Sequence, residues 1–297
     1  MNLTDVVTKF AQENGIVAGV CDAMPLDATY LKASAFTPFV QKDIEKRVNP
    51  AAIMPGVKSV VVVGVVDNGD DSYALQGTRN HPPDDATAGL SSLGTTPDYH
   101  PRVKAVLESL AATISAHTSH TYKILVDSPT LDERAFAQRA GIGFFGCHGL
   151  IISPKFGTRF NIGLLLTSAV LPQNRPFVLL ACPSDCSRCI TACPTSALSK
   201  GRPLDTARCL SYLTQKKILT AEEEMMVSHG GQLYGCDICQ DACPFNAPRK
   251  RVYVNLQDWC DKTDDNFTTE YGHTAMLWQG ADILRRNAKL QCMASVR

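Results

Sequence analysis

The spacing of apolar residues changes along the first 180 residues between helical and strand-like patterns. Apolar positions within 6–11 recur at the period of a helix that buries one face. The run from Ser59 to Val66 is β-branched, apolar on both faces and short, which predicts a buried central strand. Further strands are predicted at 16–20 and 122–126, with helices at 101–117 and 131–140.

The segments between and after these elements predict a long loop, two further strands and one further helix. Residues 67–98 are rich in Asp, Gly, Ser and Pro and are too long for an ordinary connection, which indicates an active-site loop or a mobile segment. Residues 149–171 are expected to form two strands joined by a turn at 154–157. The tail, 248–297, is polar until a predicted helix from about 274 to 290.

Composition limits the class of protein. The 297 residues are enough for a catalytic domain with a smaller module. Lys+Arg and Asp+Glu both total 29, so no net charge draws the chain toward nucleic acid or an anionic membrane. No apolar run approaches the ~18–20 residues of a spanning helix, and the N-terminus lacks the pattern of a signal peptide. We therefore expect a soluble cytoplasmic protein that does not associate with membranes.

Two cysteine runs, each ending in Cys-Pro, are the strongest chemical signal. They read Cys182-x3-Cys186-x2-Cys189-x3-Cys193-Pro194 and Cys236-x2-Cys239-x3-Cys243-Pro244, with Cys209 between them. In two-cluster ferredoxins, the Cys before Pro ligates the cluster of the other run. The pattern thus predicts two [4Fe–4S] clusters, one held by Cys182, Cys186, Cys189 and Cys243 and the other by Cys209, Cys236, Cys239 and Cys193.

Two other interpretations of these cysteines remain open at this point. Zinc also uses C-x2-C pairs, although one ion would need only four of the eight thiolates. Structural disulfides belong to oxidising compartments, to which this chain shows no route. The Cys-Pro endings and the duplication favour iron–sulfur clusters. The x3 spacing after Cys182, where x2 is usual, makes this ligand the least secure of the eight.

Several segments outside the cysteine runs resemble the epoxyqueuosine reductases, relatives of the corrinoid reductive dehalogenases. The matching segments are 98–100, 126–128, 133–135, 139–146, 150–154, 208–214, 234–240, 275–278 and 284–288. The resemblance implies an α+β fold with an α/β-like mixed sheet, a nitroreductase-like cobalamin-binding core and a ferredoxin-like double-cluster module. The expected domains are a catalytic domain at 1–180, the cluster module at 181–247, and a tail at 248–297 that packs on the core.

The resemblance also implies the chemistry. These enzymes use cobalamin and two [4Fe–4S] clusters to convert epoxyqueuosine in tRNA to queuosine, turning an epoxide into an alkene. Asp127 matches the general acid of the family. Because a free Asp has a pKa near ~3.9, this role at neutral pH requires desolvation or a nearby negative charge. The residues alone also allow Asp127 or Ser128 to be the N-cap of a helix starting near Thr130.

Cofactor contacts are expected at five further positions. They are Tyr99, His100, Cys147, His148 and Ser153. For the first two, packing at the start of a helix is an equally good interpretation. Cys147 and His148 stand where relatives carry Lys-Asn, and since thiolate and imidazole both bind transition metals, they are candidates for contact with the corrinoid or its cobalt.

The partners follow from the same resemblance. We expect tRNA as substrate carrier and a flavodoxin or ferredoxin as reductant. Longer members of the family continue into a C-terminal helical-repeat domain that helps to hold tRNA, so this chain is expected to be a short form. Only 249–251 and 285–286 form compact basic spots. Two alternatives remain, namely a corrinoid reductase of another small substrate and an iron–sulfur electron-transfer protein without this activity.

Overall fold

The computed structural model describes residues 2–27, 39–40, 42–66, 86–173 and 181–295. Their contacts divide the chain into two compact units. The first contains Met1–Asp67 and His100–Cys186, and the second contains Asn68–Tyr99 and Ser187–Arg297. Most of the long polar segment predicted at 67–98 lies outside the described residues, and only its last part, from residue 86, can be compared.

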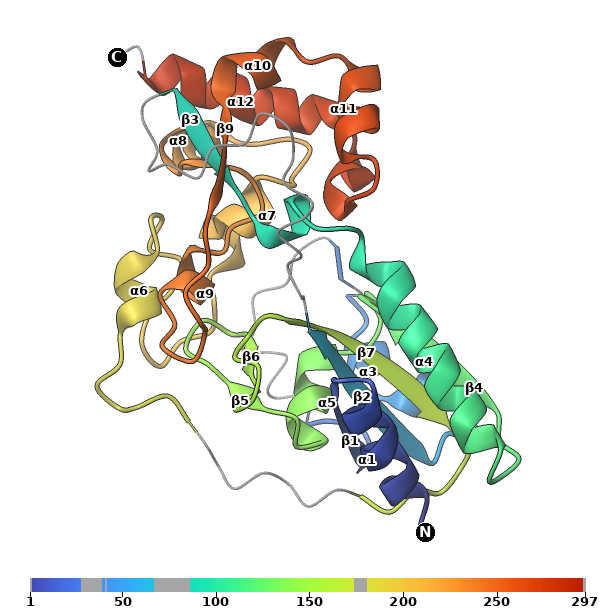
Figure 1. The fold of residues 1–297 in the computed structure, drawn as a ribbon. Coiled ribbons are helices and arrows are strands. Elements are labelled where there is room, and N and C mark those ends of the chain that lie inside the picture. The colour runs from blue at the N-terminus through green and yellow to red at the C-terminus, as the bar shows by residue number, and fades with distance from the viewer. Residues whose placement is uncertain (1, 28–38, 41, 67–85, 174–180, 296–297) are drawn as a thin grey trace. The chain divides into compact units, whose positions relative to one another are not determined.

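The first unit is built on a four-stranded antiparallel sheet in the order β1-β2-β7-β4 (Figure 1). The strands are β1 (Val17–Asp22), β2 (Ser59–Val66), β4 (Tyr122–Val126) and β7 (Phe160–Thr167). The described helices of this unit are α1 (Leu3–Glu13), α3 (Ile44–Val48), α4 (Tyr99–Ser115, from His100 on) and α5 (Glu133–Arg139), with the 3-10 turn η1 (Pro50–Ala52). The predicted central strand is confirmed, since β2 lies inside the sheet and seven of its eight residues are buried.

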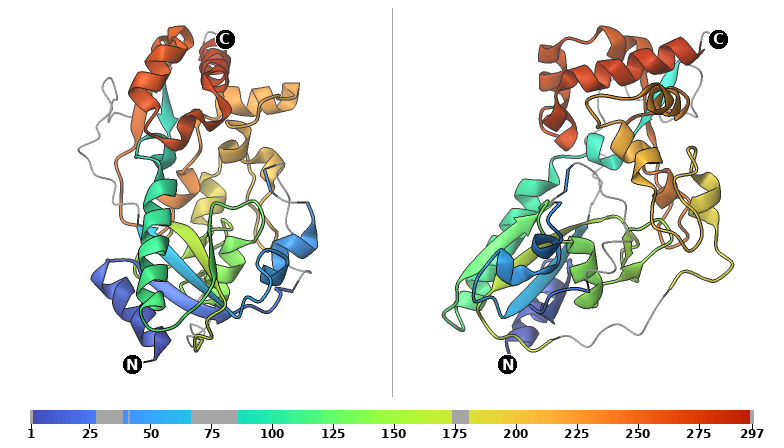
Figure 2. Two further views of the ribbon diagram at one scale, coloured as in Figure 1. Left: turned by 90° about the vertical axis from the view of Figure 1, so that its right-hand side faces the viewer. Right: turned by 180° about the vertical axis from the view of Figure 1, so that it is seen from behind.

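Helices α4 and α5 cover opposite faces of this sheet, as Figures 1 and 2 show. Leu164 and Leu166 of β7 join the core cluster that contains Phe136 of α5. Gly163 faces the other way because side chains alternate along a strand. A Cβ at Gly163 would lie 2.6 Å from Val103 and 2.7 Å from Leu107 of α4, so glycine permits the close approach of that helix.

A short hairpin follows α5 and differs from the prediction for 149–171. Strand β5 (Phe144–Phe145) pairs with β6 (Ile151–Ile152), whereas β7 joins the main sheet. The predicted turn at 154–157 is present as a bridge between Ser153 and Gly157. The physical reason is that β7 is apolar enough to be buried between β2 and β4, which a two-stranded hairpin would not allow.

The second unit contains a three-stranded sheet in the order β8-β3-β9. Its strands are β3 (Thr87–Leu90), β8 (Gln232–Tyr234) and β9 (Val252–Asn255). Its helices are α6 (Arg188–Ala192), α7 (Leu210–Leu213), α8 (Ala221–His229), α9 (Ile238–Asp241), α10 (Leu256–Asp261), α11 (Asp264–Tyr271) and α12 (Ala281–Ser295), with the 3-10 turns η2 (Ser92–Gly94), η3 (Thr206–Arg208) and η4 (Ala275–Gln279). Strand β3 pairs in parallel with β8 and antiparallel with β9.

The structure confirms the α+β class and refines its details. A mixed sheet is present, but it is the sheet of the second unit, while the sheet of the first unit is wholly antiparallel. The domains expected at 1–180, 181–247 and 248–297 stay a prediction. The contacts of the described residues group β3 and the tail with Ser187–Arg297 in the second unit.

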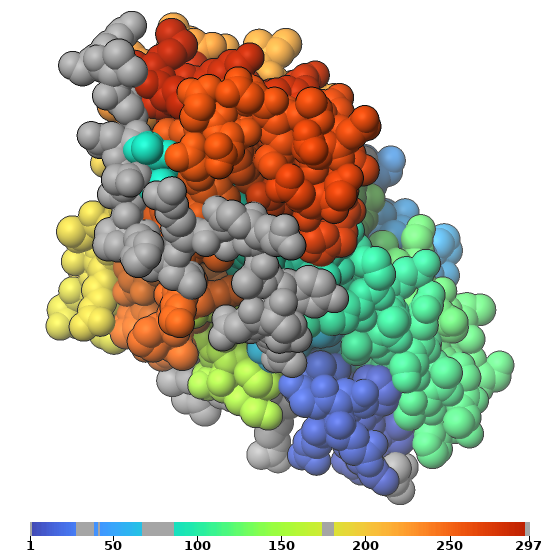
Figure 3. Space-filling model, turned by 45° about the horizontal axis from the view of Figure 1, so that its top comes forward, coloured from blue at the N-terminus to red at the C-terminus, as the bar shows by residue number. Residues whose placement is uncertain are grey.

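The tail is more folded than its polar sequence indicated. Trp259 of α10 packs edge-on against Phe267 of α11, with ring centroids 5.2 Å apart, and against Tyr271 at 5.1 Å. The outer sides of these helices carry polar residues and form the orange surface in Figure 3. The predicted helix at 274–290 is interrupted at Gly280, whose φ of 94° separates η4 from α12. Within the described ranges, no helix combines the length and the apolar character needed to cross a membrane.

Candidate functional site

Four of the predicted cluster ligands act on one another electrostatically. Burial is the largest cause that raises the pKa of Cys236 to about 12, and the groups of Cys209 and Cys193 raise it further. Burial likewise raises the pKa of Cys239, with contributions from Cys236 and Cys209. Because each thiolate disfavours the charge on the next, Cys193, Cys209, Cys236 and Cys239 lie close together, and they are the ligand set that the interleaved pattern assigns to one cluster.

The end of the first cysteine run is tied directly to the segment before Cys209. The Thr195 hydroxyl donates to the carbonyl of Arg208 at 2.5 Å, and the Nε of Arg208 donates to the carbonyl of Thr195 at 2.9 Å. This reciprocal pair lies two residues beyond Cys193 and one residue before Cys209. It therefore holds those two cysteines near each other without relying on a metal.

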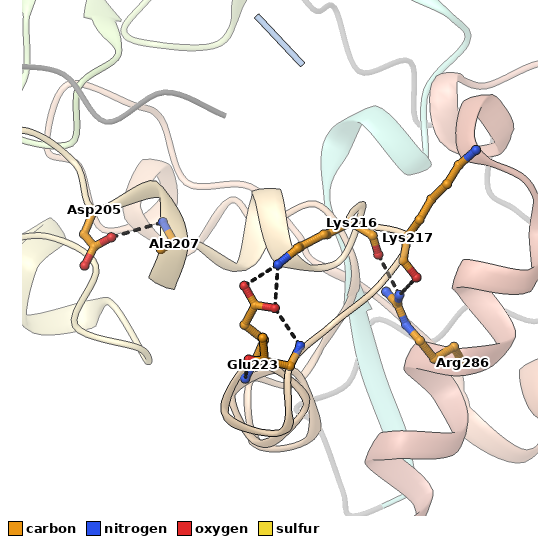
Figure 4. A network of polar contacts seen from close by, with 7 residues as sticks. Asp205, Ala207, Lys216, Lys217, Glu223 and Arg286 are labelled. Carbon is orange, nitrogen blue, oxygen red and sulfur yellow. Dashed lines mark hydrogen bonds and ion pairs between the residues drawn. The ribbon is translucent and has the colours of Figure 1, made fainter. Parts of the chain in front are cut away.

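Helix α12 fixes the segments that lead to the other two cysteines of the set. The Nδ2 of the fully buried Asn287 donates to the carbonyls of Thr214 and Leu233, both at 2.8 Å. Beside it, Arg286 donates to the carbonyls of Lys216 and Lys217, while Lys216 pairs with Glu223 at 2.6 Å (Figure 4). The loop after α7 and the strand before Cys236 are thus anchored to one helix. Sequence reasoning matched this helix to the family but gave Asn287 no role.

The remaining cluster cysteines are less fully defined. Cys189 also raises the pKa of Cys239, and α6, which carries Cys189, packs against α9, which carries Cys239. The assignment of Cys182, Cys186, Cys189 and Cys243 to one cluster stays a prediction. In the described part of the chain, no three His, Cys, Asp or Glu side chains surround the position of a single ion. A cubane does not need that arrangement, because each thiolate binds a different iron atom.

Asp127 occupies an unusual backbone position at the end of β4. Its φ is 46°, in the left-handed region that residues with side chains rarely adopt. A carboxylate oxygen lies 3.6 Å from Nε2 of His100 in the first turn of α4, and the two side chains are 66% and 42% exposed. An acid and an imidazole that both reach solvent are accessible to a ligand.

The helix-cap interpretation of Asp127 is not what the structure shows. Helix α5 begins at Glu133, and Asp132 is its N-cap, accepting from the backbone N–H of Ala135 at 3.1 Å. Ser128 instead closes a local turn by accepting from the N–H of Thr130. The predicted start of the helix near residue 130 was therefore too early, since residues 128–131 are not helical.

The first two residues of α5 connect two parts of the candidate site. Glu133 Oε1 accepts from the N–H of Ser128 at 2.9 Å, and Arg134 donates to the carbonyl of Gly149 at 3.0 Å. Burial, with smaller contributions from Asp127 and Asp132, raises the pKa of Glu133 to about 8. The residue appeared in the family resemblance, but the burial that raises the pKa of its carboxyl is visible only in three dimensions.

His148 and Ser153 are buried, in contrast to Asp127 and His100. Nδ1 of His148 accepts from the N–H of Leu150 at 3.2 Å, and burial lowers the pKa of the ring to about 4, so the neutral ring carries its hydrogen on Nε2. That atom is buried without a partner among the described residues, and it packs over Gly146. Direct cobalt ligation by this nitrogen would thus require the ring to move and lose its hydrogen.

Ser153 and Cys147 complete the hairpin. Ser153 is 1% exposed, and its backbone N–H donates to the carbonyl of Gly157 at 2.7 Å. Cys147 keeps partial exposure. Among the cofactor contacts expected in this hairpin, Cys147 is therefore the most accessible.

The two basic spots are largely engaged in contacts within the protein. Arg251 pairs with Asp241 at 2.6 Å. Arg285 pairs with Asp264 at 2.6 Å and with Asp282, and Arg286 donates to backbone carbonyls as described above. These arginines stabilise the second unit, which leaves less positive charge for phosphate than the sequence indicated.

Comparison with known proteins gives two family matches. Residues 182–246 match the 4Fe–4S double cluster binding domain, which confirms the predicted double-cluster module and disfavours the zinc and disulfide interpretations. Residues 47–128 match the model of epoxyqueuosine reductase QueG. The first match ends just past Cys243, and the second ends at Ser128, directly after Asp127.

Individual relatives extend these matches over nearly the whole chain. The epoxyqueuosine reductase of Staphylococcus aureus is 31% identical over 290 residues, covering 92% of this chain and 74% of the relative. The structure of epoxyqueuosine reductase from Streptococcus thermophilus superposes with a TM-score of 0.83 at 30% identity, covering 99% of this chain and 82% of that one. An epoxyqueuosine reductase solved with an epoxyqueuosine-modified tRNA-Tyr stem loop gives a TM-score of 0.82 at 26% identity, with the same two coverages. The chain belongs to the epoxyqueuosine reductase family.

Proposed function

We propose that this protein reduces epoxyqueuosine in tRNA to queuosine, in the cytoplasm, with electrons that pass through two [4Fe–4S] clusters. The observation that carries this proposal is the interleaved thiol set. Cys193 of the first run lies with Cys209, Cys236 and Cys239, in a chain that belongs to this family. Such a set is the arrangement of a two-cluster electron relay.

The overall reaction needs two electrons and two protons. The epoxide loses its oxygen as water and leaves an alkene, so each electron pair delivered must be matched by protons at the departing oxygen. Cobalamin, when bound, would supply a low-valent cobalt centre as the immediate reductant of the substrate. The exposed pair of Asp127 and His100 and the partly exposed Cys147 fit a bound cofactor, whereas the buried side chains of His148 and Ser153 support the hairpin.

Residues of this chain would supply the protons for the reaction. Asp127 would donate a proton to the departing oxygen, and His100, 3.6 Å away, is placed to return a proton to it from solvent. Tyr99 precedes His100 at the start of α4, and we assign it a supporting contact with the cofactor. A flavodoxin or ferredoxin would reduce the clusters.

A direct experiment tests the cofactor set and the substrate together. Anaerobic reconstitution with iron, sulfide and cobalamin should yield about eight iron atoms and about one cobalt per chain. The reconstituted protein, reduced and mixed with an epoxyqueuosine-containing stem loop, should convert the modified nucleoside to one lighter by an oxygen atom, as measured by mass spectrometry. Full iron content without cobalt uptake would instead support an iron–sulfur electron-transfer protein.

A second candidate, a corrinoid reductase of another small substrate, is favoured by one observation. The arginines of the two basic spots are engaged in internal contacts, whereas tRNA binding normally draws on a broad basic surface. Salt-sensitive binding of the stem loop to the cobalt-loaded protein decides between the two. Cobalt uptake without stem-loop binding would favour the small substrate.

A further inference from the structure

The backbone at Asp127 adopts an uncommon conformation at the end of a strand. Asp and Asn enter the left-handed region more readily than other residues with a Cβ, and the residues after Asp127 form bends rather than a helix or strand. A neighbouring group that holds such a segment therefore fixes the direction of the Asp127 side chain.

Glu133 is that neighbouring group. Its Oε1 accepts from the N–H of Ser128 at 2.9 Å, and the backbone of Asp127 interacts with the same carboxyl. The hydrogen bond spans five residues and closes the turn from the end of β4 to the start of α5.

The helix that carries Glu133 is firmly anchored at its start. Its neighbour Asp132 caps α5 and forms a buried ion pair with Arg47 at 2.9 Å, with side chains only 3% and 7% exposed. On the same helix, Phe136 and Ala137 are fully buried in the core beneath the sheet. A displacement of the Glu133 carboxyl would therefore require movement of an anchored helix.

We propose that Glu133 is a positioning residue for Asp127, holding the backbone of residues 127 and 128 so that the Asp127 carboxylate stays opposite His100. This inference rests on the proposed role of Asp127 as proton donor. Glu133 itself does not touch the substrate, and it acts only through the conformation of its neighbour.

The protonation state of Glu133 suits this role. Its environment contains Asp132 on its own helix and Asp127 on the facing segment, both of which raise its pKa, and burial contributes most. A carboxyl that stays neutral at pH 7 accepts backbone hydrogen bonds without adding a second negative charge beside Asp127. An amide of the same shape can therefore replace it, whereas a shorter or apolar side chain cannot.

Three substitutions separate positioning from general stability. Glu133→Gln keeps the acceptor oxygen and should retain kcat close to that of the unchanged protein. Glu133→Asp keeps the carboxyl but withdraws it, and Glu133→Ala removes it. Both should lower kcat by about 10²-fold through misplacement of Asp127, with KM for the stem loop and the iron and cobalt content unchanged.

The matched control is Asp5→Ala in helix α1 of the same unit. Asp5 also stands in the first turn of a helix and accepts a backbone N–H, from Asn2 at 3.0 Å, but it has no part in the candidate site. Its loss should lower the melting temperature without lowering kcat. Equal activity of Glu133→Ala and Asp5→Ala, or equal inactivity of Glu133→Gln and Glu133→Ala, would overturn the inference.

A readout independent of turnover separates this inference from the proposed function. In a crystal structure of Glu133→Asp, the φ of residue 127 should leave the left-handed region and the Asp127 carboxylate should move away from His100. Unchanged geometry there would refute the positioning role whatever the activity. Full turnover in Asp127→Asn, with the geometry of Glu133→Asp altered as expected, would refute only the assignment of Asp127 as acid.

Discussion

Nε2 of His100 lies 3.6 Å from a carboxylate oxygen of Asp127, so the first turn of α4 faces the end of β4 across an acid–imidazole pair. Both side chains are substantially exposed, and the pair is not part of the buried core. A pair of this kind can pass a proton between solvent and a bound molecule.

Replacement of Asp127 by Asn tests this pair directly. Asn tolerates the left-handed backbone and keeps the shape of the side chain, but it removes the transferable proton. We expect turnover of the modified stem loop to fall by about 10²–10⁴-fold, the usual contribution of a general acid, while iron content, cobalt content and stem-loop affinity stay unchanged. Single-turnover kinetics would measure the loss, and retention of the full rate would contradict the assignment.

Cys193→Ser should remove the cluster of the opposite cysteine run. Because Cys193 lies with Cys209, Cys236 and Cys239, its loss should lower the iron content from about eight to about four atoms per chain. Adding Cys236→Ser should lower it no further, whereas adding Cys189→Ser should remove the rest. Cys260→Ser, outside both runs, is the control and should keep all the iron. Additive loss from Cys193→Ser and Cys236→Ser would contradict the interleaved assignment.

Glu133 should make stability depend on pH. The folded protein keeps the proton on this carboxyl up to about pH 8, whereas an unfolded chain releases it near pH 4.5. The contribution of Glu133 to stability is therefore fully present below pH 4.5 and is lost as the pH rises toward 8. Melting temperatures of the unchanged protein and Glu133→Gln, measured from pH 5 to 8.5, should shift in favour of the amide as the pH increases. Parallel curves would show that the carboxyl is not held neutral.

Removing one partner of the buried ion pair of Arg47 and Asp132 should lower the free energy of unfolding far more than neutralising both partners. Arg47→Met leaves the Asp132 charge buried without its partner and should lower the free energy of unfolding by about 3–5 kcal/mol. Adding Asp132→Asn removes that charge and keeps the cap on Ala135, so most of the stability should return. Urea denaturation measures both changes, and equal destabilisation of the single and double variants would contradict this account.

The elements that the sequence predicted well are those whose pattern reports burial. The β-branched run 59–66 is confirmed residue for residue as β2, since a strand covered on both faces leaves little choice of side chain. The tail was predicted poorly because α10 and α11 each bury only two large side chains, among them Trp259 and Phe267. Segments that short do not show a helical period in the sequence.

The candidate site likewise contains features that the sequence predicted and features that it did not. The cysteine spacing implied the grouping of Cys193 with Cys209, because ligand geometry leaves a regular sequence signature. Nothing in the sequence reveals that burial raises the pKa of Glu133, or that Thr195 and Arg208 exchange hydrogen bonds. Those properties depend on which segments the fold brings together.

The central position of β3 has a consequence for how the protein is made. Thr87–Leu90 leaves the ribosome long before its neighbours Gln232–Tyr234 and Val252–Asn255. The sheet of the second unit can therefore close only after Asn255 has been synthesised, and contacts so distant in sequence form slowly. A fragment that begins at the first cysteine run would lack the middle strand of its own sheet. We therefore expect the double-cluster segment to fold in another protein only when β3 is included, although β3 precedes the first cysteine run by about a hundred residues.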